Sequence, residues 1–181
     1  MDKNTKRPVA LVVGGSSGLG LALVRELLQK NYEVHATGTK APKTKGVMGH
    51  PFDATYSVEN IALDMFRLSS VIPNIELLIY AAGFSQIGRI AELKGVEIAA
   101  MTNISFVAPI LLVSEILRRQ ERLPACVFIT STSQWTPRPE EPVYAAAKAG
   151  LAHFGHSISK DPQIGKVLVV GPSGMNTKMC K

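Results

Sequence analysis

Close to the start of the chain stands the stretch Pro8-Val9-Ala10-Leu11-Val12-Val13-Gly14-Gly15-Ser16-Ser17-Gly18-Leu19-Gly20, in which an apolar run passes into a cluster of glycines. The apolar part is short, nearly continuous and rich in β-branched residues, as is typical of a strand buried on both faces. After the glycines, apolar residues between Leu19 and Gln29 recur at helical spacing. The sequence therefore predicts a strand, a glycine turn and a helix as its first structural unit.

Strand and helix patterns continue to alternate along the rest of the chain. Further strands are expected at residues 33–37, 77–80, 126–130 and 166–170, a weak one at 47–52, and helices at 58–70, 101–119 and 144–159. The linker 40–47 is too short for a helix between the second and third strands. Such alternation implies right-handed crossovers and a parallel sheet covered on both faces. We therefore predict an α/β fold, a doubly wound parallel sheet of the Rossmann type, in a single domain over residues 1–181.

Composition and charge narrow the class of protein. The 181 residues are 46% hydrophobic and 19% charged, which is ordinary for a globular chain with its own core. No apolar stretch reaches the roughly 20 residues of a membrane span. The first residues lack the apolar region of a secretory signal, so a cytoplasmic location is expected. Cys126 and Cys180 have neither metal-ligand nor disulfide spacing and are interpreted as free thiols.

The net charge of +6 is spread along the chain, and a phosphate-rich small ligand explains it as well as nucleic acid does. We expect no metal, nucleic acid or membrane as a partner. Ligands in doubly wound folds bind outside the carboxyl ends of the strands, which is where the glycine turn is expected.

A glycine-rich turn at this place suits a diphosphate, which needs close backbone approach, main-chain N–H groups and the positive end of a helix. Gly14 would allow the tight turn, Gly18 the close approach, and Gly20 the packing of helix on strand. A turn of this kind can also be purely structural. Its spacing, G-x-x-x-G-x-G, differs from the usual dinucleotide pattern G-x-G-x-x-G.

This turn resembles that of the short-chain dehydrogenase/reductase family, and partial matches to other motifs of the family follow in order. Asp53, followed by Ala54, matches the acidic residue that the family places beside the adenine ring. Ala81-Ala82-Gly83 resembles the family's Asn-Ala-Gly motif without its Asn. The segment 169–177 resembles Pro-Gly-x-x-x-Thr with a serine in place of the glycine, and its threonine would hold the nicotinamide carboxamide. The resemblance covers essentially the whole chain and implies a nicotinamide cofactor.

The end of the second expected strand indicates which nicotinamide cofactor binds. About 20 residues beyond the turn, a unit selective for NAD carries an acid, whereas one for NADP offers a cation and small polar groups. Gly38 stands where the acid is expected, and Thr39 and Lys40 follow it, so NADP is favoured over NAD. The lysines of this linker also fit a solvated loop. Together, the residues assigned to the cofactor are Gly14, Ser16, Ser17, Gly18, Leu19, Gly20, Thr39, Lys40, Asp53, Ala54, Ala81, Ala82, Gly83, Tyr144, Lys148, Pro172, Ser173, Met175 and Thr177.

Candidate catalytic residues lie in the last third of the chain. Tyr144 and Lys148 stand one helical turn apart, so both side chains project from one face of the expected helix. An adjacent cation stabilises phenolate and brings the tyrosine pKa toward the working range, so Lys148 would tune Tyr144 for proton transfer. The family resemblance assigns carbonyl binding to Ser131 and the holding of a relay water to Asn103. The serine assignment can slip by two residues, because it is flanked by Thr130, Thr132 and Ser133.

These matches imply an NADPH-dependent carbonyl reductase or alcohol dehydrogenase that acts on a small molecule as a homodimer or homotetramer. Family members usually continue well past the segment 169–177, which motivates an alternative, a non-catalytic dinucleotide-binding or interaction protein. The substrate is not identified by the sequence. The segment 134–142 is expected to border its pocket, with Trp135 as an apolar wall and Arg138 either facing an acidic substrate or lying in solvent. A further set fits either a dimer interface or the core: Phe106, Ile110, Leu151 and Phe154.

Overall fold

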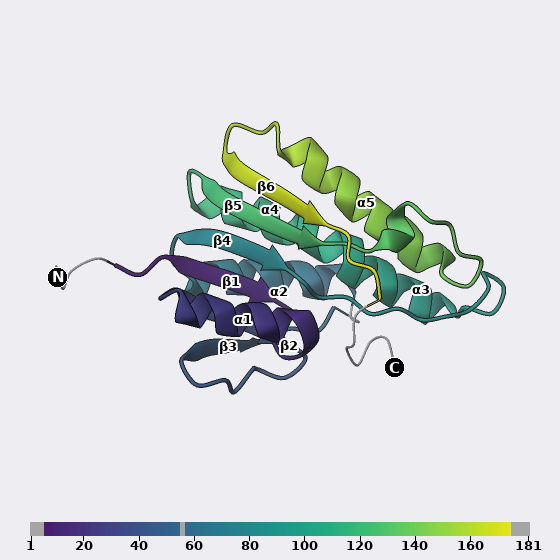
Figure 1. Ribbon diagram of the computed structural model, residues 1–181, viewed down its shortest axis with the longest axis horizontal. Helices are drawn as coiled ribbons and strands as arrows, with labels where there is room; N and C mark the ends of the chain where they lie inside the picture. The colour runs from purple at the N-terminus through teal and green to yellow at the C-terminus, as the bar shows by residue number, and fades with distance from the viewer. Residues whose placement is uncertain (1–5, 55–56, 175–181) are drawn as a thin grey trace.

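The computed structural model of the chain describes residues 6–54 and 57–174, and its centre is a six-stranded sheet in the order β3-β2-β1-β4-β5-β6 (Figure 1). The strands are β1 (Val9–Val13), β2 (Glu33–Gly38), β3 (Val47–Pro51), β4 (Ile75–Tyr80), β5 (Leu123–Ile129) and β6 (Ile164–Val170). Every pair of neighbouring strands runs parallel. The strand order reverses beside β1, which confirms the predicted doubly wound α/β fold.

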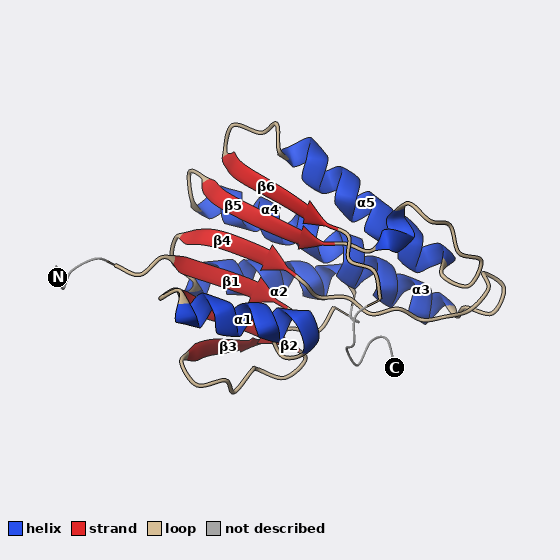
Figure 2. Ribbon diagram, viewed as in Figure 1, coloured by secondary structure: helices blue, strands red, loops and turns tan. Residues whose placement is uncertain are grey.

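Helices lie on both faces of the sheet (Figure 2). Helix α1 (Gly18–Gln29) covers one face, whereas α2 (Val58–Val71) and α4 (Ala108–Arg119) cover the other. The remaining helical elements are α3 (Gly95–Thr102), a π-helical segment η1 (Asn103–Val107), a short 3-10 turn η2 (Thr132–Gln134) and α5 (Pro142–Ile158).

The core has two parts, one on each face of the sheet. Successive residues of β1 point to opposite faces, so Leu11 joins the larger cluster with residues of α2 and α4, whereas Val12 joins the smaller cluster with residues of α1. Every residue of β1 is buried. This burial on both faces is the physical reason why β1 appears in the sequence as a continuous apolar run.

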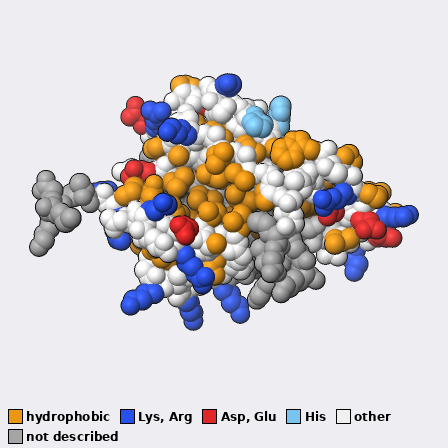
Figure 3. Space-filling model, in the orientation of Figure 1, with side chains coloured by type: hydrophobic (Ala, Val, Ile, Leu, Met, Phe, Trp, Pro, Cys, Tyr) orange, Lys and Arg blue, Asp and Glu red, His pale blue; other side chains and the backbone are white. Residues whose placement is uncertain are grey.

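The face that carries α1 is only partly covered by the described residues. Figure 3 shows hydrophobic side chains gathered on this face, over the strands beyond α1. Leu77 and Val127 are half-buried there, and Leu168, in register with Val127, is 57% exposed. The described residues therefore leave an apolar part of the sheet open to solvent.

The helix expected at 101–119 differs from the structure in two ways. Helical structure begins six residues earlier, at Gly95, where the Lys94 main-chain N–H donates a hydrogen bond to the Glu97 carboxylate over 2.8 Å. It is also interrupted by η1, in which the Ile104 main-chain oxygen accepts a hydrogen bond of 2.7 Å from the Tyr80 hydroxyl. This interruption is accompanied by a tertiary contact, which helical spacing in the sequence cannot report.

The connection between β2 and β3 contains no helix, as the short linker predicts. The segment 47–52, predicted as a weak strand, forms β3 and pairs with β2 from Val34 opposite Val47 to Gly38 opposite Pro51. Because β3 is half-exposed at the edge of the sheet, its sequence shows little apolar periodicity.

One helical run, Gly95–Arg119, is long and apolar enough to cross a membrane by length and composition, with a mean hydropathy of 1.9. No single apolar stretch of the sequence indicated it, because the run joins α3, η1 and α4. This is weak evidence, because core helices of soluble proteins pass the same test. The buried residues of α4, such as Leu112 and Ile116, pack in the larger core cluster, as expected of a core helix.

Candidate functional site

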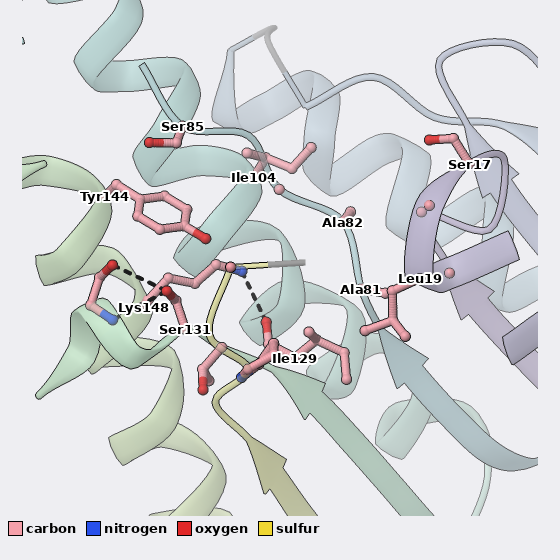
Figure 4. Close-up of a pocket in the computed structure, with 18 of the residues that line it drawn as sticks. Ser17, Leu19, Ala81, Ala82, Ser85, Ile104, Ile129, Ser131, Tyr144 and Lys148 are labelled. Atoms are coloured by element: carbon pink, nitrogen blue, oxygen red, sulfur yellow. Dashed lines mark hydrogen bonds between the residues drawn. The ribbon is translucent and has the colours of Figure 1, made fainter. Parts of the chain in front are cut away.

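A cavity of about 640 Å³ lies at the carboxyl ends of the strands (Figure 4). Its wall is formed by the glycine turn after β1, the ends of β2 and β4, the segment after β5, the first turns of α5 and the segment after β6. Residues far apart in the sequence thus meet at one place, the place where ligands bind in doubly wound folds.

The glycine turn follows β1 in a conformation that side chains would obstruct. Gly14 and Gly18 have positive φ angles of 87° and 54°. A Cβ atom on Gly14 would lie 2.7 Å from the Ala82 nitrogen, and one on Gly20 would lie 2.1 Å from the Gly14 oxygen. The turn is therefore packed directly against the start of α1 and the end of β4, and it leaves main-chain groups at the N-terminus of α1 beside the cavity.

The segment after β4 is equally close-packed. Ala81 donates a main-chain hydrogen bond of 2.8 Å to Val13, which continues the pairing of β4 with β1 beyond the strand. A Cβ atom on Gly83 would lie 3.2 Å from Lys148 Nζ. Ala81, Ala82 and Gly83 all line the cavity.

Tyr144 and Lys148 project from α5 into the wall of the cavity and are 8% and 3% exposed. Lys148 Nζ lies 5.8 Å from the centre of the Tyr144 ring and donates a hydrogen bond of 2.9 Å to the Ile129 main-chain oxygen. Burial lowers the pKa of Lys148 to about 8. Below that pH the buried ammonium stands beside the phenol, the arrangement that lowers a tyrosine pKa.

Ser131 lines the same cavity, two residues beyond the end of β5 (Figure 4). Its Oγ donates a hydrogen bond of 3.1 Å to Ser133 Oγ and accepts one of 3.2 Å from the Ser133 main-chain N–H. Ser133 Oγ in turn donates a bond of 2.7 Å to Glu141, whose carboxylate also accepts from Arg138 over 3.3 Å. A continuous chain of polar groups thus connects Ser131 to a half-exposed guanidinium.

Several predicted cofactor residues do not line the cavity. Lys40 is exposed and lies outside the lining, whereas Gly38 and Thr39 are part of it. Ala54 is fully buried in the larger core cluster, and Asp53 beside it also lies outside the lining.

Of the remaining predicted site residues, Asn103 begins η1, is 9% exposed and does not line the cavity. Pro172 and Ser173 do line it. Met175 and Thr177 lie outside the described residues, as does Cys180. Among the residues that the structure describes, no group of three or more His, Cys, Asp or Glu side chains is placed to hold a metal ion.

The cavity also contains residues that sequence reasoning missed. Thr37 and Phe52 could have been predicted from their places at the ends of β2 and β3. Thr37 Oγ1 accepts a hydrogen bond of 3.2 Å from the Gly14 main-chain N–H. Glu141 lies in the segment 134–142, which the sequence already placed at the pocket, but it was given no role there; in the structure it is the residue directly before α5. No sequence signal pointed to Ser85 or Ile104, because a loop and an unpredicted π-helical segment position them.

Comparison with known proteins identifies relatives along almost the whole chain. The sequence matches the family described as short chain dehydrogenase over residues 8–181. It is 26% identical over 177 residues to the 3-oxoacyl-[acyl-carrier-protein] reductase MabA of Mycobacterium avium, covering 94% of this chain and 68% of that protein. It is 25% identical over 181 residues to carbonyl reductase family member 4 of Xenopus tropicalis, covering 94% of this chain and 77% of that protein.

Solved structures share the fold. The 3-oxoacyl-[acyl-carrier protein] reductase of Brucella melitensis in complex with NAD superposes with a TM-score of 0.81 at 24% identity, over 97% of this chain and 77% of that one. A short chain dehydrogenase of Burkholderia cenocepacia in complex with NADP gives 0.78 at 22% identity, over 96% and 75%. At these identities the superpositions support the fold alone.

Proposed function

Because the chain belongs to the short chain dehydrogenase family, we propose that it is an NADP-dependent oxidoreductase that reduces a small carbonyl compound or oxidises the corresponding alcohol. The observation that carries this proposal is that Ser131, Tyr144 and Lys148 line the same cavity as the glycine turn. A proton-transferring site and a phosphate-binding turn in one cavity are what such a reaction requires.

The cavity fits a nicotinamide dinucleotide in the chemistry of its donors. The diphosphate would lie against the turn, where Gly14 and Gly20 leave no room for a side chain and the first N–H groups of α1 are available. Ala82 and Gly83 would allow the cofactor to pass over the sheet edge toward Pro172 and Ser173. When bound, the nicotinamide supplies the hydride chemistry.

The choice of NADP over NAD is supported by the end of β2. Gly38 and Thr39 line the cavity there without an acidic side chain, and a Cβ atom on Gly38 would lie 2.6 Å from Ser16 Oγ. A carboxylate at this position would repel a 2′-phosphate, whereas Ser16, Thr39 and the nearby Lys40 offer donors and a positive charge.

In the proposed mechanism, Tyr144 gives a proton to the carbonyl oxygen during reduction and takes one from the alcohol during oxidation. Lys148 assists because its ammonium stabilises the phenolate form of Tyr144. Its pKa of about 8 keeps it charged at neutral pH. Ser131 would hold the oxygen in place, and Asn103 would act behind the wall of the cavity as the holder of a relay water.

The substrate class proposed for the first test is a 3-oxoacyl thioester, because the relatives include a 3-oxoacyl-[acyl-carrier-protein] reductase and a carbonyl reductase. The test compares wild-type protein with Tyr144→Phe, using NADPH and acetoacetyl-coenzyme A. We expect Tyr144→Phe to lower kcat by at least about 100-fold, the usual range for loss of an acid–base group. Its Kd for NADPH should stay within about two-fold, since the phenol ring and the turn remain.

The matched control is Tyr32→Phe, because Tyr32 stands before β2, at the opposite end of the strands from the cavity. Unchanged turnover in Tyr144→Phe would rule out the proposed mechanism. If wild-type protein binds NADPH but reduces neither this thioester nor a panel of simple ketones and aldehydes, the proposed substrate class is wrong, and the alternative of a non-catalytic dinucleotide-binding protein is favoured.

We also propose a cytoplasmic homodimer or homotetramer. The free, buried thiol of Cys126 is compatible with a reducing compartment. Of the residues expected at an interface, Leu151 is fully buried in the core, and Phe154 packs edge-on against Phe128 at 5.7 Å. Phe106 lies against Gly150. The half-buried Ile110 is therefore the best remaining candidate, and light scattering of the purified protein tests the oligomeric state.

A further inference from the structure

A hydrogen-bonded chain connects Ser131 to the acidic side chain of Glu141. Ser131 Oγ lies 3.1 Å from Ser133 Oγ, which lies 2.7 Å from Glu141 Oε2. Ser133 is 3% exposed. Arg138 stands 3.3 Å from both oxygens of Glu141. The chain therefore ends at a carboxylate that forms an ion pair with Arg138.

The direction of donation along this chain follows from the number of protons. An ionised carboxylate only accepts, so the single hydroxyl proton of Ser133 points to Glu141. The bond between the two serines must then be donated by Ser131. Ser131 Oγ also accepts from the Ser133 main-chain N–H. One lone pair of Ser131 remains for a ligand in the cavity, and its proton is already in use.

We propose that Glu141, acting through Ser133, is a positioning residue that makes Ser131 present a hydrogen-bond acceptor to the ligand. In this state Ser131 matches the hydroxyl of an alcohol. A carbonyl oxygen, which only accepts, binds after Ser131 has given up its bond to Ser133. Glu141 thereby determines the relative affinity of the site for an alcohol and for its ketone. This inference rests on the proposed function, since it takes the cavity as the substrate site.

Removal of the carboxylate reverses the chain. Without Glu141, the buried hydroxyl of Ser133 has Ser131 Oγ as its remaining partner in the chain and donates to it. The proton of Ser131 is then free to point into the cavity. Ser133→Ala has the same effect by a different route, because it removes the acceptor to which Ser131 donates.

The experiment uses full-length protein in the Tyr144→Phe background, where the proposed chemistry is switched off and both ligands are titrated at equilibrium. Acetoacetyl-coenzyme A and 3-hydroxybutyryl-coenzyme A, a ketone and its alcohol, are titrated into the NADPH complex by calorimetry. We expect Glu141→Ala to raise the ketone affinity relative to the alcohol affinity by about 3- to 10-fold, the value of one hydrogen bond. Ser133→Ala should do the same, and the double variant should add nothing further.

The control is Glu140→Ala, which removes the same charge from an exposed neighbour and should leave the ratio of affinities unchanged. A ratio that stays within two-fold of the parent in Ser133→Ala and in any folded Glu141 variant overturns the inference, even if both affinities fall. Continued turnover in the Tyr144→Phe background overturns the proposed function instead. Failure of both thioesters to bind while NADPH binds overturns the substrate assignment, and the inference with it.

Discussion

Lys148, on α5, donates a hydrogen bond of 2.9 Å from Nζ to the main-chain oxygen of Ile129, the last residue of β5. This bond joins the helix that carries Tyr144 to the strand that leads into Ser131. The buried ammonium has two opposing effects on stability. Its hydrogen bond stabilises the geometry of the candidate site, whereas its burial costs free energy because a charge is removed from water.

The cost of burying Lys148 predicts a pH dependence of stability. Burial lowers the pKa of Lys148 from 10.5 to about 8, so between these values the unfolded chain binds more protons than the folded one. Folding stability should therefore rise with pH across this window, by on the order of 3 kcal/mol from this group. Lys148→Met should lack the rise and be more stable than wild type at pH 7, while losing turnover.

Urea unfolding at several pH values between 7 and 10.5 measures this effect as the difference between wild type and Lys148→Met. The difference is needed because burial raises the pKa of the Cys126 thiol to about 12, so that group destabilises the fold as pH rises above its ordinary value. Lys160→Met, at an exposed position, is the control. Parallel pH profiles for wild type and Lys148→Met would contradict the prediction.

The close approach within the glycine turn predicts a severe effect of one methyl group. A Cβ atom on Gly20 would lie 2.1 Å from the Gly14 main-chain oxygen, which cannot move without displacing β1. Gly20→Ala should lower the free energy of unfolding by about 1–3 kcal/mol or more and abolish NADPH binding. Gly95→Ala, at the start of α3 where a Cβ meets nothing within 4 Å, should change neither.

Urea unfolding and NADPH fluorescence titration on the two glycine variants distinguish these outcomes. A Gly20→Ala protein with wild-type stability and NADPH affinity would contradict the prediction, because it would show that the turn can accommodate a Cβ atom at this position.

The sequence predicted those parts of the fold whose cause is local or periodic. The double burial of β1 produces an apolar run, and the helical spacing after Gly18 reflects a single packed face. The glycines of the turn were also predictable, because a close approach of two backbones excludes other residues. The order of the motifs along the chain was enough to predict that Tyr144, Lys148 and Ser131 lie close together, and all three line one cavity.

The parts that the sequence did not predict depend on tertiary contacts. The bond of 2.7 Å between Ser133 and the Glu141 carboxylate joins η2 to the residue before α5, and no local pattern reports such a contact. Ala54 was assigned to the cofactor from its place in a motif, but the structure buries it in the core. The interruption at η1 is likewise accompanied by a contact with Tyr80, a residue of a distant strand.

The proposed preference for NADP predicts that the exposed Lys40 contributes to the affinity for NADPH but not for NADH. Lys40 is exposed and does not line the cavity, but it directly follows Thr39, which does. We therefore expect its charge to attract the 2′-phosphate of NADPH through a short layer of solvent. Lys40→Ala should weaken NADPH binding by about 2- to 5-fold and leave NADH binding unchanged, as expected of one exposed charge pair.

The measurement is a fluorescence titration with NADPH and NADH at low and high salt, since screening should reduce the difference between Lys40→Ala and wild type. Lys30→Ala, at the far end of α1 from the cavity, is the control for net charge. Equal losses for both cofactors would show that Lys40 does not read the 2′-phosphate.

The contact between Tyr80 and η1 predicts a stability effect that reaches the cavity wall. The Tyr80 hydroxyl is fully buried and donates a hydrogen bond of 2.7 Å to the main-chain oxygen of Ile104, whose side chain lines the cavity. Burial raises the pKa of Tyr80, so its hydroxyl stays protonated and able to donate at every pH used for assays.

Tyr80→Phe removes this buried donor and leaves the Ile104 main-chain oxygen without it, which should lower the free energy of unfolding by about 1–3 kcal/mol. Because η1 is positioned partly by this bond, the substrate KM should rise more than the Kd for NADPH, whose proposed binding turn lies on β1 and α1. Urea unfolding and steady-state kinetics measure the two effects, with Tyr32→Phe as the matched control. A Tyr80→Phe protein as stable as the control would mean that η1 keeps its geometry without the hydroxyl, and that α3 and α4 alone determine the interruption.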